Sequence, residues 1–99
     1  MLTAPRIAPR PDPDDHTACY EIVVVVDNNV APRVAVRAPD GQGLDVVNVE
    51  VGAAISDTQR EVVFVVEAAR VDVPWTMTVI VSVGADEGRF AGPVIETRP

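Results

Sequence analysis

The side chains most able to do chemistry lie near the N-terminus. His16 and Cys19 are the single histidine and the single cysteine of the chain, and three aspartates, Asp12, Asp14 and Asp15, come just before them. An imidazole can act as a general base toward a thiol, and aspartate carboxylates can bind a divalent cation. A catalytic pair and a metal site are therefore the first two kinds of chemistry to weigh.

The spacing of His16 and Cys19 does not favour catalysis. The two residues are three positions apart on a stretch expected to be extended, which does not hold them in hydrogen-bond geometry. The chain has no lysine, and the hydroxyls of Ser56 and Ser82 have no candidate base other than His16. We predict that the protein is not an enzyme and has no catalytic residues, unless His16 and Cys19 converge with another group in a pocket.

A metal site is also disfavoured. Structural zinc sites need four nitrogen or sulfur ligands, and the chain offers one histidine and one cysteine. Calcium would accept the aspartate cluster at residues 12–15 or the turn at residues 27–29, but neither run has the glycine and glutamate of an EF-hand loop. We predict no metal and no cofactor, with calcium binding by the aspartate cluster as the alternative to a solvated acidic turn.

Charge and hydropathy exclude several classes of partner. The 99-residue chain has a formal net charge of −7, and all eight basic residues are arginine. Nucleic acids and anionic membranes are disfavoured as partners because both are bound by clusters of basic side chains. The longest aliphatic run, residues 22–26, is too short to span a membrane, and residues 1–10 contain no apolar signal-peptide core. We expect cytoplasmic synthesis, which is compatible with a place in a virion.

Strands dominate the expected structure. The chain is 47% hydrophobic but only 4% aromatic, and 21 residues are valine, whose branched side chain favours a pleated strand. The clearest strand is residues 75–83, where apolar and polar residues alternate and Ile80 is the one apolar residue on the polar face. We expect further strands at 20–27, 33–38, 44–51, 61–69 and 89–97. We expect a loop at 53–59, with a short helix that begins at residues 53–55 as the alternative.

This pattern predicts an all-β fold, a small antiparallel β-sandwich of about six to seven strands, immunoglobulin-like or jelly-roll-like. The strand spacing loosely resembles immunoglobulin and fibronectin type III modules, but the Cys–Trp–Cys pattern of immunoglobulin domains is absent, so no family is assigned. Gly92 and Pro93 interrupt the last strand, which predicts an edge or a bulge there. Trp75 is expected to be a core anchor whose indole N–H has a partner, and the alternative is an exposed platform for a sugar ring or a partner protein.

The first 19 residues differ from the rest of the chain. Pro5, Pro9, Pro11 and Pro13 recur there, and proline at this density favours extended chain. We therefore expect an extended N-terminal arm over residues 1–19 and a single sandwich domain over residues 20–99. The arm is expected to act as a strap that lies on its own domain or on a neighbour.

Two strands break the alternation rule, because residues 22–26 and 62–66 are apolar on both faces. A small sandwich turns one face of each sheet to solvent, so one side of these strands needs cover from the arm, a loop or a neighbouring subunit. Ile80 would mark the middle of the same interface if it lies beside these valines. The residues expected to form the interaction surface are Pro5, Pro9, Pro11, Pro13, Val23, Val25, Val62, Phe64 and Ile80.

The expected function is that of a non-catalytic structural or interaction protein that self-associates or docks on a larger assembly through its arm and valine-rich sheet faces. A decoration or cement protein of a phage capsid is one setting that fits. The expected partner is protein, in a homo-oligomer or an assembly, without nucleic acid or membrane. The alternative is a carbohydrate- or small-ligand-binding sandwich, with or without calcium, whose loops would contain Asp27, Asn28, Asn29 and Asp86.

Overall fold

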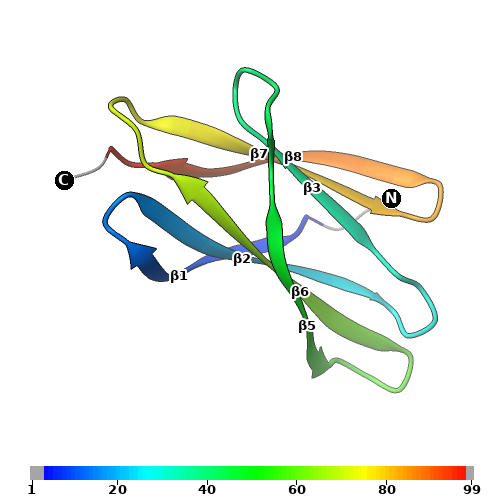
Figure 1. The fold of residues 1–99 in the computed structure, drawn as a ribbon. Coiled ribbons are helices and arrows are strands. Elements are labelled where there is room, and N and C mark those ends of the chain that lie inside the picture. The colour runs from blue at the N-terminus through cyan, green and yellow to red at the C-terminus, as the bar shows by residue number, and fades with distance from the viewer. Residues whose placement is uncertain (1–3, 98–99) are drawn as a thin grey trace.

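Valine-rich extended segments form two antiparallel sheets in the computed structural model, which describes residues 4–97 (Figure 1). The strands are β1 Arg6–Asp14, β2 Thr17–Asp27, β3 Arg33–Arg37, β4 Gly43–Leu44, β5 Val46–Ala54, β6 Gln59–Ala69, β7 Trp75–Val83 and β8 Asp86–Ile95. The first sheet has the order β1-β2-β6-β5 and the second has the order β4-β3-β7-β8. Residues 4–97 contain no helix, and so none that is long and apolar enough to cross a membrane.

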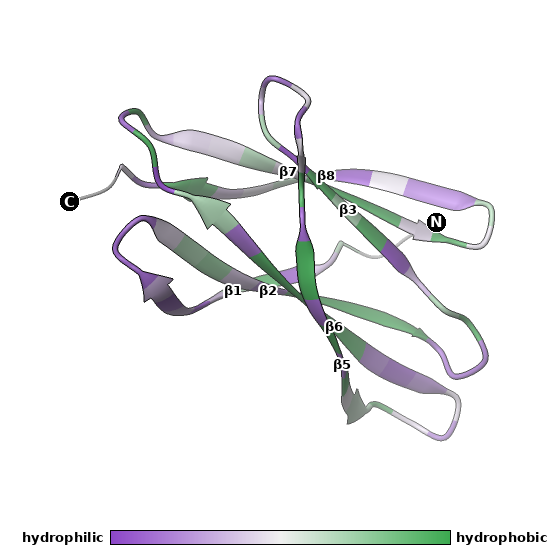
Figure 2. Ribbon diagram, viewed as in Figure 1, coloured by the Kyte–Doolittle hydropathy of each residue, from purple (hydrophilic) through white to green (hydrophobic). Residues whose placement is uncertain are grey.

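The core lies between the two sheets. Alternate residues of β2 and β6 face alternate residues of β3, β7 and β8, because side chains of a strand point to opposite faces in turn. Hydrophobic residues run along β2 and β6 through the middle of the first sheet (Figure 2). The largest fully buried side chains of this core are Ile22, Val36, Val66, Met77, Val79, Val81 and Ile95. This two-layer core confirms the expected all-β sandwich.

The two strands expected to be apolar on both faces occupy the centre of the first sheet. β2 and β6 pair with each other over their whole length, from Thr17 opposite Ala69 to Asp27 opposite Gln59. β1 flanks β2 on one side and β5 flanks β6 on the other. These neighbours pair with the edges of the two central strands but do not cover the outer face of the sheet, so the apolar residues on that face need a different cover.

The strand at residues 75–83 has the predicted bounds, and the strand predicted at residues 44–51 is wrong in one respect. The chain leaves the second sheet after Leu44 and joins the first at Val46, so the predicted strand is split into β4 and β5. No glycine or proline marks the change of sheet, since Asp45 alone separates the two strands. An alternation of apolar and polar residues indicates which face of a sheet each side chain points to, but it does not indicate which sheet the strand belongs to.

The loop predicted at residues 53–59 is also shorter than expected. β5 continues to Ala54, and a tight turn leads directly into β6 at Gln59, whose carbonyl accepts hydrogen bonds from the amides of Ile55 and Ser56. The interruption of the last strand is confirmed. β8 is an edge strand, and its pairing with β7 shifts register where Gly92 and Pro93 lie.

Most of the proline-rich N-terminal segment is a strand of the first sheet. β1 pairs with β2 from Arg6 opposite Val23 to Asp14 opposite Thr17. Proline is tolerated in a sheet on an edge strand with its nitrogen toward solvent, so Pro9, Pro11 and Pro13 fit β1. Residues 1–3 of the expected arm lie outside the described residues.

Trp75 begins β7 and is half-buried against the core. Its indole Nε1 donates a hydrogen bond to the carbonyl oxygen of Ala69 at 3.0 Å, which is the partner that a packed indole needs. The ring also lines a small apolar cleft of about 330 Å³ with Val71 and Val73.

The burial of Phe64 predicts a large loss of stability on truncation. We expect Phe64→Ala to lower the free energy of unfolding by about 3–5 kcal/mol, because it removes a buried ring and leaves a cavity. Val51 is 80% exposed, so Val51→Ala should cost about 0.5 kcal/mol or less. Urea denaturation followed by tryptophan fluorescence measures both. A cost for Phe64→Ala as small as that for Val51→Ala would place the ring outside the core.

Candidate functional site

His16 and Cys19 do not form a pair in the structure. His16 is exposed in the turn between β1 and β2, where its backbone amide donates to Asp14 Oδ1 at 2.8 Å. Cys19 lies within β2 and is buried on the outer face of the first sheet. Burial, and next the nearby charge of Glu67, raises the pKa of the Cys19 thiol. A raised pKa keeps the sulfur protonated near neutral pH, and a neutral thiol is a poor nucleophile.

Two of the three clustered aspartates, Asp12 and Asp14, have partners other than a metal. Asp12 forms an ion pair with Arg70 at 2.9 Å, and Asp14 accepts the bond from His16 described above. Within residues 4–97, no three His, Cys, Asp or Glu side chains gather in a group that could hold a metal ion. The aspartate cluster is therefore divided between an ion pair and a turn.

The candidate ligand loops lie at one end of the sandwich but belong to different connections. Residues 27–29 lead from β2 toward β3, and Asp86 begins β8 after the turn at Gly84. Asn28 is held by the β5–β6 turn, because its amide donates to the Thr58 carbonyl and its Nδ2 donates to the Asp57 carbonyl, both at 2.8 Å. These bonds give Asn28 a structural role.

The outer face of the first sheet carries a second apolar cluster, which consists of Cys19, Val23, Val63 and Val65. These residues are buried although no third layer lies over them. Their neighbours in register on the flanking strands are long charged side chains, since Arg10 is opposite Cys19 and Glu50 is opposite Val63. The aliphatic stems of such side chains can cover apolar surface while their charged ends stay in water.

Ion pairs hold these long side chains across the sheet. Arg10 on β1 reaches Glu50 on β5, with Nη2 3.0 Å from Oε1, and its Nε lies 3.6 Å from Glu21. Arg6 similarly reaches Glu61 on β6 at 3.3 Å. The hydrogen bond to Glu50 is the main cause of a raised pKa for Arg10. We name the ion-paired side chains of this face the ionic cover of the first sheet, which consists of Arg6, Arg10, Glu21, Glu50 and Glu61. The ionic cover lies over the outer valines, which need shielding from solvent.

The structure separates the residues expected to form one interaction surface. Val62 and Phe64 face the core between the sheets, and Val23 lies under the ionic cover. Val25 remains exposed on the outer face of the first sheet. Ile80 lies on the outer face of the second sheet and therefore is not beside these valines. Pro5 precedes β1, and Pro9, Pro11 and Pro13 lie on its free edge.

β5 has an exposed apolar edge that was not predicted from the sequence. Val47, Val49 and Val51 are 50%, 56% and 80% exposed. Val49 and Val51 pair with Phe64 and Val62, so they point to the inner side of the first sheet, but the second sheet does not extend over them. The alternation of these valines was visible in the sequence, but their position at an edge depends on strand order.

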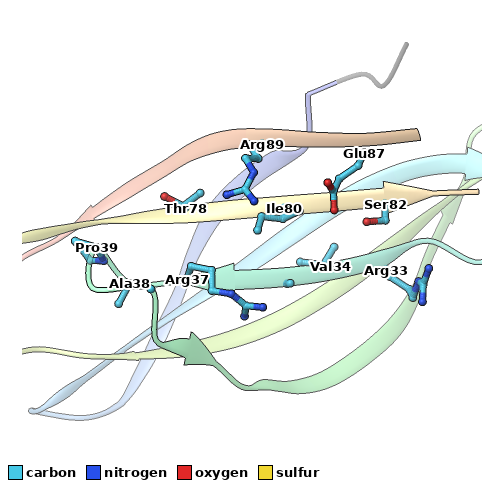
Figure 3. Close-up of a pocket in the computed structure, with 12 residues that line it drawn as sticks. Arg33, Val34, Arg37, Ala38, Pro39, Thr78, Ile80, Ser82, Glu87 and Arg89 are labelled. Carbon is cyan, nitrogen blue, oxygen red and sulfur yellow. The ribbon is translucent and has the colours of Figure 1, made fainter. Parts of the chain in front are cut away.

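A groove crosses the outer face of the second sheet and was also missed. It has a volume of about 830 Å³ and is lined by β3, β7, β8 and the loop after β3 (Figure 3). Ile80 is in its floor, opposite Ala35 on β3 and Arg89 on β8. Two further sets of residues pair across β3, β7 and β8 on this face. One set is Arg33, Ser82 and Glu87, and the other is Arg37, Thr78 and Ala91.

The arginines of the groove differ from those of the ionic cover. Arg33 and Arg89 form no ion pair with any residue in the range 4–97, and Arg37 donates only to the Val36 carbonyl, at 3.4 Å. Among residues 4–97, Glu87 is the one carboxylate of the lining. In a chain with a net charge of −7, this groove is a local concentration of positive charge.

The ionic cover predicts the reactivity of Cys19. We expect Arg10→Ala to increase the rate at which Ellman's reagent labels the folded protein several-fold, because the arginine stem opposite Cys19 is removed. Arg10→Met keeps most of the stem and should stay close to the wild type, as should Arg33→Ala on the other sheet. An unchanged rate in Arg10→Ala would show that other groups protect the thiol.

Comparisons of the chain with protein-family models, with curated proteins and with solved structures found no significant match.

Proposed function

We propose that this chain is a non-catalytic interaction protein that pairs with a second copy of itself through the edge of β5. The observation that carries the proposal is the exposed row of Val47, Val49 and Val51 on an edge strand. An edge strand presents unpaired backbone N–H and C=O groups, and exposed valines beside them favour the addition of another strand. Self-association through a valine-rich surface is the function expected from the sequence, at a different set of valines.

The other three sheet edges are poor sites for strand addition. Three prolines on β1 remove outward-facing donors, and β4 is only two residues long. β8 carries the bulge at Gly92 and Pro93, and its regular half bears the charged residues Asp86, Glu87 and Arg89. β5 has nine residues and no proline, and its own register shifts, between Val46 and Asn48 and between Val51 and Ala54, leave residues 48–51 regular. With one such edge per chain, pairing favours a closed dimer over a filament.

The sequence of β5 supports an antiparallel pairing with the two-fold axis at Val49. In this register Val47 lies opposite Val51 of the second copy, and Asn48 lies opposite Glu50 of the second copy. Apolar residues then meet apolar residues, and an amide donor meets a carboxylate. An axis at Glu50 would instead place like charges directly opposite each other, which is destabilising.

The strand order supports an immunoglobulin-like arrangement as part of the proposal. The order β1-β2-β6-β5 corresponds to strands A-B-E-D of that fold, and β3-β7-β8 corresponds to C-F-G. Such a fold does not identify a function by itself. Docking on a larger assembly, such as a phage capsid, would require a further surface on the proposed dimer.

Replacement of Val49 tests the proposal. We expect the wild type to sediment as a dimer and Val49→Lys as a monomer, because the charge at the two-fold axis would face its own copy. Val94 is exposed to a similar degree on the second sheet, at 50% against 56% for Val49. Val94→Lys should therefore remain a dimer and controls for added charge. A wild type that stays monomeric up to millimolar concentration in sedimentation equilibrium would contradict the proposal.

A further inference from the structure

The groove of the second sheet is a built arrangement of charged, polar and apolar side chains. Arg33 and Arg37 lie four residues apart on the same face of β3, which places their Cα atoms about 13 Å apart. Arg89 lies on the other side of Ile80, two strands from β3 (Figure 3). The hydroxyls of Thr78 and Ser82 flank Ile80 on β7. Three guanidinium groups thus surround one apolar position.

The absence of carboxylate partners for these guanidinium groups among residues 4–97 points to an anionic ligand. Three of the other described arginines, Arg6, Arg10 and Arg70, are within ion-pair distance of carboxylates. The fourth, Arg60 on β6, has no carboxylate partner among residues 4–97 but donates to the Val30 carbonyl at 3.3 Å. The groove arginines have no carboxylate partner among residues 4–97, although the chain has 15 acidic residues. Guanidinium groups bind carboxylates through paired, charge-assisted hydrogen bonds.

We propose that the groove binds an extended acidic peptide segment of a partner protein, with two carboxylates four residues apart and an apolar residue midway between them. An extended peptide repeats at the same interval as β3, so its two carboxylates match the separation of Arg33 and Arg37. The midway side chain falls at the level of Ala35 and Ile80. Arg89 then pairs with a carboxylate from the far side of the groove.

A nucleic acid fits the groove less well. Single-stranded nucleic acids are bound by aromatic platforms as well as by cations, and the lining contains no aromatic side chain. The net charge of −7 also repels a long polyanion, whereas a short peptide engages the local field of the groove. The site is on the opposite sheet from β5, so it is independent of the proposed dimer contact.

The experiment is an amide NMR titration of the whole chain with the peptide acetyl-Glu-Ser-Val-Ser-Glu-amide. We expect shift changes centred on Ala35, Ile80 and Arg89, and none with a peptide in which both glutamates are glutamine. Arg89→Gln should weaken binding about tenfold, the loss of roughly one charge-assisted hydrogen bond. Arg6→Gln, which changes charge equally on the first sheet, should not.

Glu87 provides a test of opposite sign. Glu87→Gln should tighten binding several-fold, because it removes the one carboxylate of the groove lining. Asp57→Asn makes the same change of net charge in the β5–β6 turn and should have no comparable effect. The spectra themselves report whether each variant is folded.

Two results would overturn the proposal. The first is the absence of shift changes at the highest soluble peptide concentration, or changes that are insensitive to Arg89→Gln and Glu87→Gln. The second is binding of single-stranded oligothymidine with the same dependence on Arg89, but no binding of the peptide. Neither result depends on the oligomeric state of the protein, so failure here is distinguishable from failure of the β5 dimer.

Discussion

The bridge from Arg10 on β1 to Glu50 on β5 decides which surfaces of this sandwich are closed. Two layers of sheet bury one face of each sheet and leave the other to solvent. The first sheet nevertheless has valines on its outer face, and the stems of the ionic cover lie over them. Exposed pairs of this kind contribute little as Coulomb attraction, so their main effect is the cover that their stems give.

Because the ionic cover shields most of the outer face of the first sheet, contacts with other chains are expected at different surfaces. The outer valines of β2 and β6 are the most obvious association surface in the sequence, but Val23, Val63 and Val65 are already covered within the chain and only Val25 of this set remains exposed. Two surfaces remain open. One is the edge of β5, where the second sheet does not reach, and the other is the groove on the second sheet, where the guanidinium groups have no carboxylate partner among residues 4–97. One surface is apolar with free backbone groups and the other is cationic, so they suit different partners.

The sequence predicted features that depend on local pattern. The bounds of β7, the burial of both faces of β2 and β6, and the interruption of β8 all follow from periodicity or from proline chemistry. Features that depend on strand order could not be predicted in this way. The bond from Arg10 to Glu50 joins residues 40 positions apart, and the groove exists because β3, β7 and β8 are neighbours. The change of sheet at Asp45 left no local signal at all.

Hydrogen–deuterium exchange of the wild-type chain at low and high protein concentration tests for the β5 dimer, because it reads the backbone of β5 itself. We expect the amides of residues 48–51 to exchange more slowly as concentration rises, while the edge amides of β8 do not change. Exchange in β5 that is independent of concentration, in a sample that sedimentation shows to be dimeric, would place the contact elsewhere and rule out pairing through β5.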